Sequence, residues 1–132
     1  MKQTYDTGIA TNQINLGVTA GTVGTAYTSV TLVNAAGQSS KIAESDQDSG
    51  NISERTIGTG GALKNSYVVI RTTIDLSNID PSLWPGQQQN LAMRYQLTGG
   101  FSGSQTFIQE ADDVVASPDG KTLVVSKAIQ LL

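Results

Sequence analysis

Two residue types that are central to enzyme chemistry are missing, because the chain has no cysteine and no histidine among its 132 residues. The lack of cysteine excludes disulfides, thiolate nucleophiles and cysteine-ligated zinc. The lack of histidine removes the usual general base, the Ser-His-Asp and Cys-His arrangements, and the commonest transition-metal ligand. We therefore expect a protein that is not an enzyme and that needs no cofactor.

Charge is also scarce in this chain. Charged residues make up 14% of it, and 11 acidic residues against 8 basic ones give a net charge of -3. Nucleic acids and anionic membranes attract clusters of lysine and arginine, whereas the basic residues here are scattered. No apolar run is long enough for a signal sequence or a membrane span. We expect no direct nucleic-acid partner and no membrane insertion; the localisation stays open, with a virion or an extracellular assembly as the favoured setting.

Apolar side chains recur at every second position, which is the spacing of strands that bury one face. The length and the hydrophobic fraction of 38% fit a single domain covering residues 1–132. Amphipathic helix spacing is absent, and we expect at most one helical turn, near Ser77 to Leu83. The pattern predicts an all-β protein, a two-layer antiparallel β-sandwich of immunoglobulin-like or jelly-roll kind with roughly seven to nine strands. The alternating segments are Ile14 to Val18, Ala26 to Leu32, Val68 to Leu76, Leu91 to Leu97, a segment around Thr106 to Ile108, and Leu123 to Leu131.

Proline and glycine mark the turns between these segments. The sequence Ser117 to Lys121 places proline and glycine where a tight turn needs them, so we expect residues 111–116 and 122–128 to form a hairpin. Trp84 to Gly86 predicts a corner between two strands. In the last alternating segment, Leu123 to Leu131, Lys127 interrupts the apolar pattern. Asp112 and Asp113 are adjacent acids that would point to opposite faces of a strand, and so could not act on one substrate atom.

The longest uncharged run extends from Asp6 to Lys41 and contains strand-forming residues. Soluble proteins usually protect exposed strand edges with charge or proline, so this run is expected to pair with the chain's own sheet or with a neighbouring subunit. Residues 1–24 are a possible extended N-terminal arm, and residues 128–132 end the sequence without a polar tail. The candidate interface side chains are Ile14, Leu16, Val18, Ile129 and Leu131.

Acidic side chains gather in residues 44–54. Oxygen ligands two residues apart resemble the start of a calcium loop, which makes Asp46, Asp48 and Glu54 the candidate metal ligands. The register of a calcium loop fails, because Ile57 stands where the twelfth-position glutamate is needed. The favoured interpretation is a solvated loop of turn-forming residues that holds no metal.

Trp84 is the single tryptophan and has three interpretations. It could close one end of the sandwich, anchor a protein interface, or stack on a sugar ring. A Leu-Trp-Pro corner favours the first. The neighbouring run of residues 87–90, three glutamines and an asparagine, could supply hydrogen bonds to a sugar or simply lead into a strand.

Two function classes follow from these observations. The leading hypothesis is a structural or interaction protein that self-assembles with copies of itself or related subunits through strand or arm exchange, as capsid, tail, filament and surface-layer components do. The alternative is a monomeric β-sandwich module that recognises carbohydrate or protein through loops near Trp84. The first predicts a homo-oligomer and the second a monomer.

Overall fold

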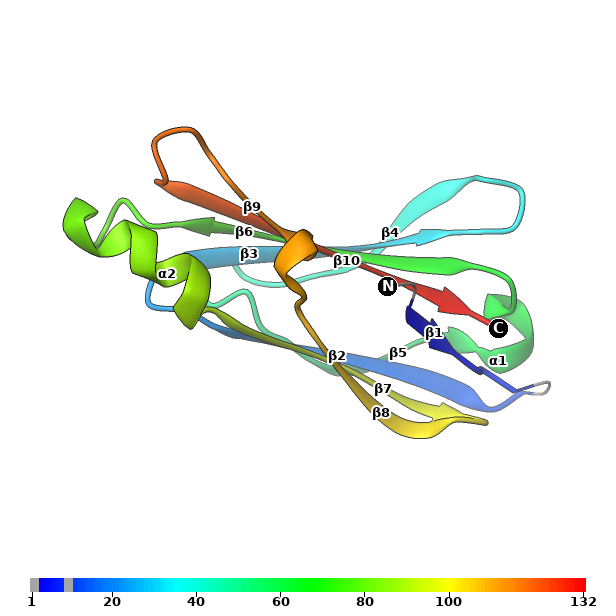
Figure 1. Ribbon diagram of the computed structural model, residues 1–132. Helices are drawn as coiled ribbons and strands as arrows, with labels where there is room; N and C mark the ends of the chain where they lie inside the picture. Colours follow the sequence, from blue (N-terminus) through cyan, green and yellow to red (C-terminus); the bar gives the residue numbers. More distant parts are fainter. Residues whose placement is uncertain (1–2, 9–10) are drawn as a thin grey trace.

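The computed structural model describes residues 3–8 and 11–132 and confirms the all-β sandwich predicted from the sequence. Its strands form a six-stranded sheet and a four-stranded sheet, which face each other in two layers (Figure 1). The numbering reaches β10, so the predicted strand number was slightly too low. One strand pair, β1 with β10, is parallel, whereas the prediction was an antiparallel sandwich.

In the six-stranded sheet, β6 pairs with one edge of β10 along nearly the whole strand. Two short strands share the other edge of β10: β1 pairs with its end and β9 with its beginning. The order is β1-β10-β6-β3-β4, and β9 also pairs with β10. The strands are β1 (Gln3–Tyr5), β3 (Thr25–Val33), β4 (Ser39–Glu44), β6 (Tyr67–Asp75), β9 (Val114–Ala116) and β10 (Thr122–Leu131).

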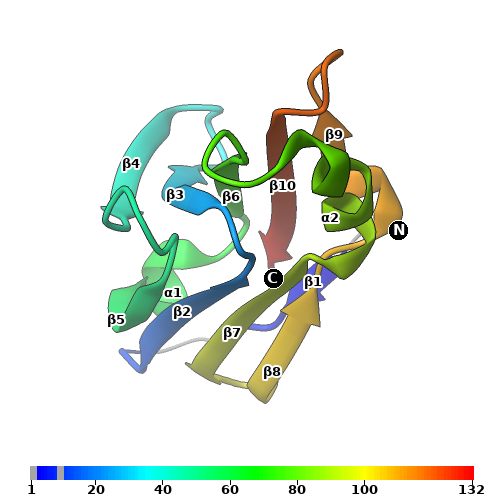
Figure 2. The ribbon, with the colours of Figure 1, turned by 90° about the vertical axis from the view of Figure 1, so that its left-hand side faces the viewer.

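The four-stranded sheet has the order β5-β2-β7-β8 and is antiparallel throughout. Figure 2 shows β8 at one outer side of this sheet, with β7 next to it and β2 beyond β7. The strands are β2 (Gln13–Gly21), β5 (Ile52–Thr59), β7 (Ala92–Gly100) and β8 (Gly103–Ile108).

The core lies between the two sheets and is built from the alternating stripes read in the sequence. Ile70 and Ile74 on β6 and Leu97 on β7 are all 0% exposed. Threonines at two inward positions, Thr28 and Thr72, have their hydroxyls 2.7 Å apart, so these buried polar groups satisfy each other. The period of two therefore identified the buried face of each long strand correctly.

The uncharged segment between Asp6 and Lys41 forms β2 and β3. Each of these strands lies inside a sheet with a partner on both sides: β5 and β7 for β2, and β4 and β6 for β3. The sequence left open whether this segment pairs with the chain's own sheets or with a neighbouring subunit. Both strands pair within the chain's own sheets.

The helical content is higher than the sequence indicated. The expected turn appears as η1 (Pro81–Leu83), but the predicted corner at Trp84 opens a helix, α2 (Trp84–Asn90), at one end of the sandwich (Figure 1). Asp80 accepts a hydrogen bond from Ser82 N and begins this helical region. No residue of α2 is buried, so it lacks the apolar periodicity that would have revealed it. Two further helical turns are α1 (Gly60–Leu63) and η2 (Ala111–Asp113).

The predicted hairpin is confirmed in a shorter form. β9 pairs with β10 in the register Ala116 with Leu123 through Val114 with Val125. Residues 111–113 form η2 rather than a strand, so Asp112 and Asp113 are not placed on opposite faces of a sheet as expected.

Candidate functional site

The five side chains predicted to form an interface lie in the chain's own core. Ile14, Leu16, Ile129 and Leu131 are 0% exposed and Val18 is 2% exposed. These positions are already covered within one chain. A second subunit that contacts this folded chain therefore has to use a different surface.

Sheet edges offer such a surface, because an edge strand carries backbone groups without a partner. Two of the edge strands carry charge of both signs. Lys41 and Glu44 on β4 form an ion pair of 2.7 Å, and β5 exposes Glu54 and Arg55. Charge of this kind disfavours pairing with another chain.

The edge strand β8 is different, since its six residues include no charge and no proline. Its register with β7 is continuous from Gln105 to Ile108 and has one irregularity, between Leu97 and Gly100 of β7. Ile108 is 62% exposed, and Phe101, in the turn before the strand, is 84% exposed. Within the described part of the chain, β8 is the one edge strand longer than three residues that lacks charge.

The beginning of β8 is fixed by the N-terminal segment. The hydroxyl of Tyr5 donates to the carbonyl of Gly103 at 2.6 Å and accepts from the amide of Gly100 at 2.9 Å. The amide of Asp6 donates to the Ser102 hydroxyl at 3.1 Å. Tyr5 is 1% exposed, so these bonds are shielded from competing water.

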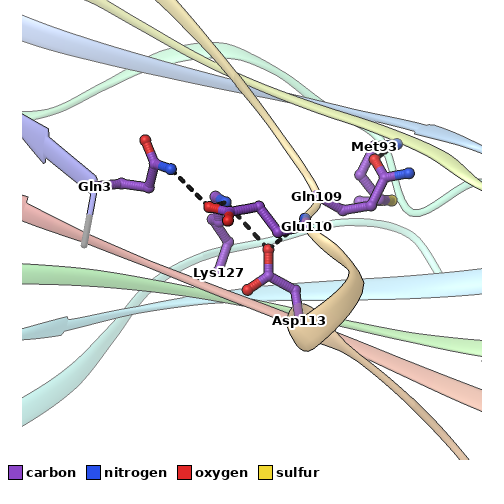
Figure 3. A network of polar contacts seen from close by, with 6 residues as sticks. All are labelled: Gln3, Met93, Gln109, Glu110, Asp113 and Lys127. Carbon is purple, nitrogen blue, oxygen red and sulfur yellow. Dashed lines mark hydrogen bonds and ion pairs between the residues drawn. The ribbon is translucent and has the colours of Figure 1, made fainter. Parts of the chain in front are cut away.

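The end of β8 is fixed by the side chain of Gln109. Its Oε1 accepts from the amide of Met93 at 2.8 Å (Figure 3). Its Nε2 donates to the carbonyl of Leu91 at 2.6 Å. The side chain thus takes the place of a further backbone pairing beyond Ile108. A free edge that is held at both ends loses little conformational entropy when it is bound.

An ion-pair network around a buried lysine joins the chain leaving β8 to the opposite sheet. Lys127 on β10 is 2% exposed, and its Nζ lies 3.3 Å from Glu110 Oε1 and 3.1 Å from Asp113 Oδ2 (Figure 3). Gln3 on β1 donates to the same Glu110 oxygen at 2.7 Å. The Lys127 position falls between the part of β10 paired with β1 and the part paired with β9. The network therefore closes the gap between these two short strands.

Two titratable groups in or near this network, Glu110 and Tyr95, have shifted pKa values. The hydrogen bond from Gln3, and then the hydrogen bond and charge of Lys127, lower the pKa of Glu110 below its ordinary value. Burial, and secondarily the charge of Asp113, raise the pKa of Tyr95. The buried Tyr95 hydroxyl has no hydrogen-bond partner among the residues described, and it remains protonated.

The candidate metal ligands do not form one cluster. Asp46 Oδ1 accepts from the amides of Asp48 at 2.9 Å and Ser49 at 2.7 Å, which closes a turn and lowers the pKa of Asp46. Glu54 lies on β5 and accepts from the hydroxyl of Thr98 at 3.2 Å. No group of three or more acidic, histidine or cysteine side chains that could hold a metal occurs in residues 3–8 and 11–132.

Trp84 is half-buried and packs against the core at one end of the sandwich. Its Nε1 donates to the carbonyl of Leu76 at 2.8 Å, which fits the interpretation that it closes this end. Two hollows adjoin α2, of about 280 Å³ and about 590 Å³, and both are lined by Pro85 and Gln88. The smaller is bordered by Trp84, and the larger by Gln89.

Sequence reasoning placed a strand segment around Thr106 to Ile108 but did not identify β8 as an exposed edge, and it missed the ion-pair network, although each left a signal. The run between Arg94 and Glu110 is also uncharged, but it is shorter than the run before Lys41, on which the interface prediction was based. Lys127 occupies an inward position in an apolar stripe, where a charge requires buried partners. Nothing in the sequence identifies Glu110 and Asp113 as those partners.

Comparison with protein-family models, with curated proteins and with solved structures gives no match to this chain. In the described ranges there is no helix with the length and apolar character to span a membrane.

Proposed function

We propose that this chain is a structural or interaction protein that assembles with copies of itself or with related subunits, as capsid, tail, filament and surface-layer components do. The observation that carries the proposal is the uncharged edge strand β8 with the exposed side chains of Phe101 and Ile108 beside it. The binding surface is this edge, in place of the buried side chains of β2 and β10.

Strand addition satisfies two needs of such an edge at once. The unpaired amides and carbonyls gain partners from the added strand, and the exposed apolar side chains leave water. Fully burying a side chain the size of isoleucine contributes about 1.5–3 kcal/mol. Because Tyr5 and Gln109 already hold the two ends of β8, most of this gain is available for association.

The test adds a positive charge to the edge and measures the native mass by light scattering over a range of concentrations. Ser104→Lys combined with Ile108→Lys should convert a concentration-dependent oligomer into a monomer. The matched control combines Ser39→Lys with Ser40→Lys, which adds the same two charges to the exposed but already charged edge strand β4. A parent protein that is monomeric up to about 1 mM, where an association of about -4 kcal/mol is half complete, would overturn the proposal.

The second candidate is a monomeric module that binds carbohydrate or protein beside Trp84. The adjoining hollows along α2, with the amides of Gln88 and Gln89 at their borders, favour it. The test titrates glycans and follows the fluorescence of Trp84. Gln88→Ala and Gln89→Ala should weaken binding while leaving the fold intact, since both side chains lie on the unburied α2.

A further inference from the structure

We infer that two copies of this chain meet through β8 in an antiparallel, two-fold symmetric pair, so that the unit of assembly is a closed dimer. The inference rests on the proposed function and specifies its contact. Such a pair would join the two four-stranded sheets into one continuous sheet.

The other edge strands of the molecule are less suited than β8 to pair with β8 of a second copy. β4 and β5 carry charges of both signs. β1 and β9 have three residues each and follow one another along the same edge of β10. In the described structure β8 is therefore the only edge suited to accept β8 of a second copy. A contact between identical edges is isologous and closes on itself, rather than extending into a filament.

The antiparallel direction follows from geometry. When two copies present the same edge of the same strand, a regular ladder forms only if one copy is turned by half a turn about an axis normal to the sheet. That rotation reverses the strand direction and keeps the same face of both sheets on the same side. It also places one residue of β8 directly opposite its own copy.

The exposed apolar side chains agree with this direction. Phe101 precedes β8 and Ile108 ends it, so they lie at opposite ends of one strand. In an antiparallel pair, the Ile108 end of one copy meets the Phe101 end of the other. Both exposed side chains of each copy are then brought toward an apolar partner.

Charge is also compatible with self-pairing. A two-fold axis brings like side chains together, which is unfavourable for an edge that carries lysine or glutamate. Thr106 and Ile108 are outward positions of β8, because they pair with the exposed Gln96 and Arg94 of β7, and Ser104 lies two residues before Thr106. None of these three is charged, so the two copies meet without like-charge repulsion.

Single cysteines test the symmetry, because the chain has no cysteine of its own. Ser104→Cys, Gln105→Cys and Thr106→Cys are oxidised mildly, and disulfide dimers are measured on non-reducing gels. A disulfide needs Cα atoms about 4.4–6.8 Å apart, so the variant nearest the axis should cross-link much faster than its neighbours. Ser40→Cys on β4 is the control for random collision.

The possible outcomes distinguish a failure of the two-fold β8 pair from a failure of the proposed self-assembly. One β8 position that cross-links at least about tenfold faster than Ser40→Cys supports the two-fold pair. An oligomer in which no β8 cysteine cross-links faster than the control would overturn the pair but leave self-assembly standing. A monomer at every concentration would overturn both.

Discussion

The ammonium group of Lys127 lies 3.1 Å from the carboxylate of Asp113, and this pair connects the longest strand of one sheet to the turn that follows the edge strand of the other. The lysine side chain is 2% exposed and that of Asp113 is 20% exposed. Asp113 Oδ2 also accepts from the amide of Glu110 at 2.7 Å. The pair thus fixes the path of the chain between β8 and β9.

Replacing the buried lysine should destabilise the fold. Lys127→Met removes the positive charge that balances Glu110 and Asp113, and leaving carboxylates without their partner is costly. Both carboxylates keep some contact with solvent, so we expect a loss of about 2 kcal/mol in the free energy of unfolding, less than for a fully buried pair. Urea denaturation measures it, with Lys121→Met on the exposed turn as control. Equal midpoints for the two variants would show that the network contributes nothing.

Acid should weaken the same network. The pKa of Glu110 in the folded protein is lowered from its ordinary value of 4.5, so the folded state holds this proton less tightly than the unfolded state. The stabilisation is therefore present above pH 4.5 and is lost as the pH falls through the lower folded pKa. Melting temperatures between pH 7 and pH 3 should fall, and Glu110→Gln should make the decrease shallower. A variant with an unchanged slope would contradict the assignment to Glu110.

Gln109 should control the order of the β8 edge. Gln109→Leu removes the bonds to the Met93 amide and the Leu91 carbonyl, which we expect to cost about 1–2 kcal/mol and to free the end of β8. Hydrogen exchange at the Met93 amide should accelerate strongly. Gln105→Leu, on the exposed part of β8, is the matched control and should leave that amide protected. Self-association should weaken in the first variant because its edge is less ordered.

Trp84 should act mainly as a structural closure of the sandwich end. Trp84→Phe keeps most of the apolar contact and loses the bond to the Leu76 carbonyl, for an expected cost of about 1 kcal/mol. Trp84→Ala also removes the packing and should cost about 3 kcal/mol. Chemical denaturation of both variants checks this order. Two variants as stable as the parent would instead favour a displayed, ligand-binding tryptophan.

Local patterns predicted the parts of this fold that depend on local chemistry. The alternation from Val68 to Leu76 identified the buried face of β6, and the turn at Ser117 to Lys121 identified the β9–β10 hairpin. α2 was missed because it buries no residue and has no side-chain cap of its own, since Asp80 caps the preceding η1. The edge site was missed because exposure of a strand edge depends on strand order.

Composition and side-chain spacing are enough to specify a two-layer β-sandwich without histidine or cysteine chemistry, because they are properties of single residues and their near neighbours. Which uncharged strand is covered and which is left at an edge depends on the strand order of the folded chain. β2 lies between two partners whereas β8 has one, and β1 reaches β10 from the other end of the chain. Such pairings join distant residues through backbone groups that every residue carries, so no local pattern specifies them.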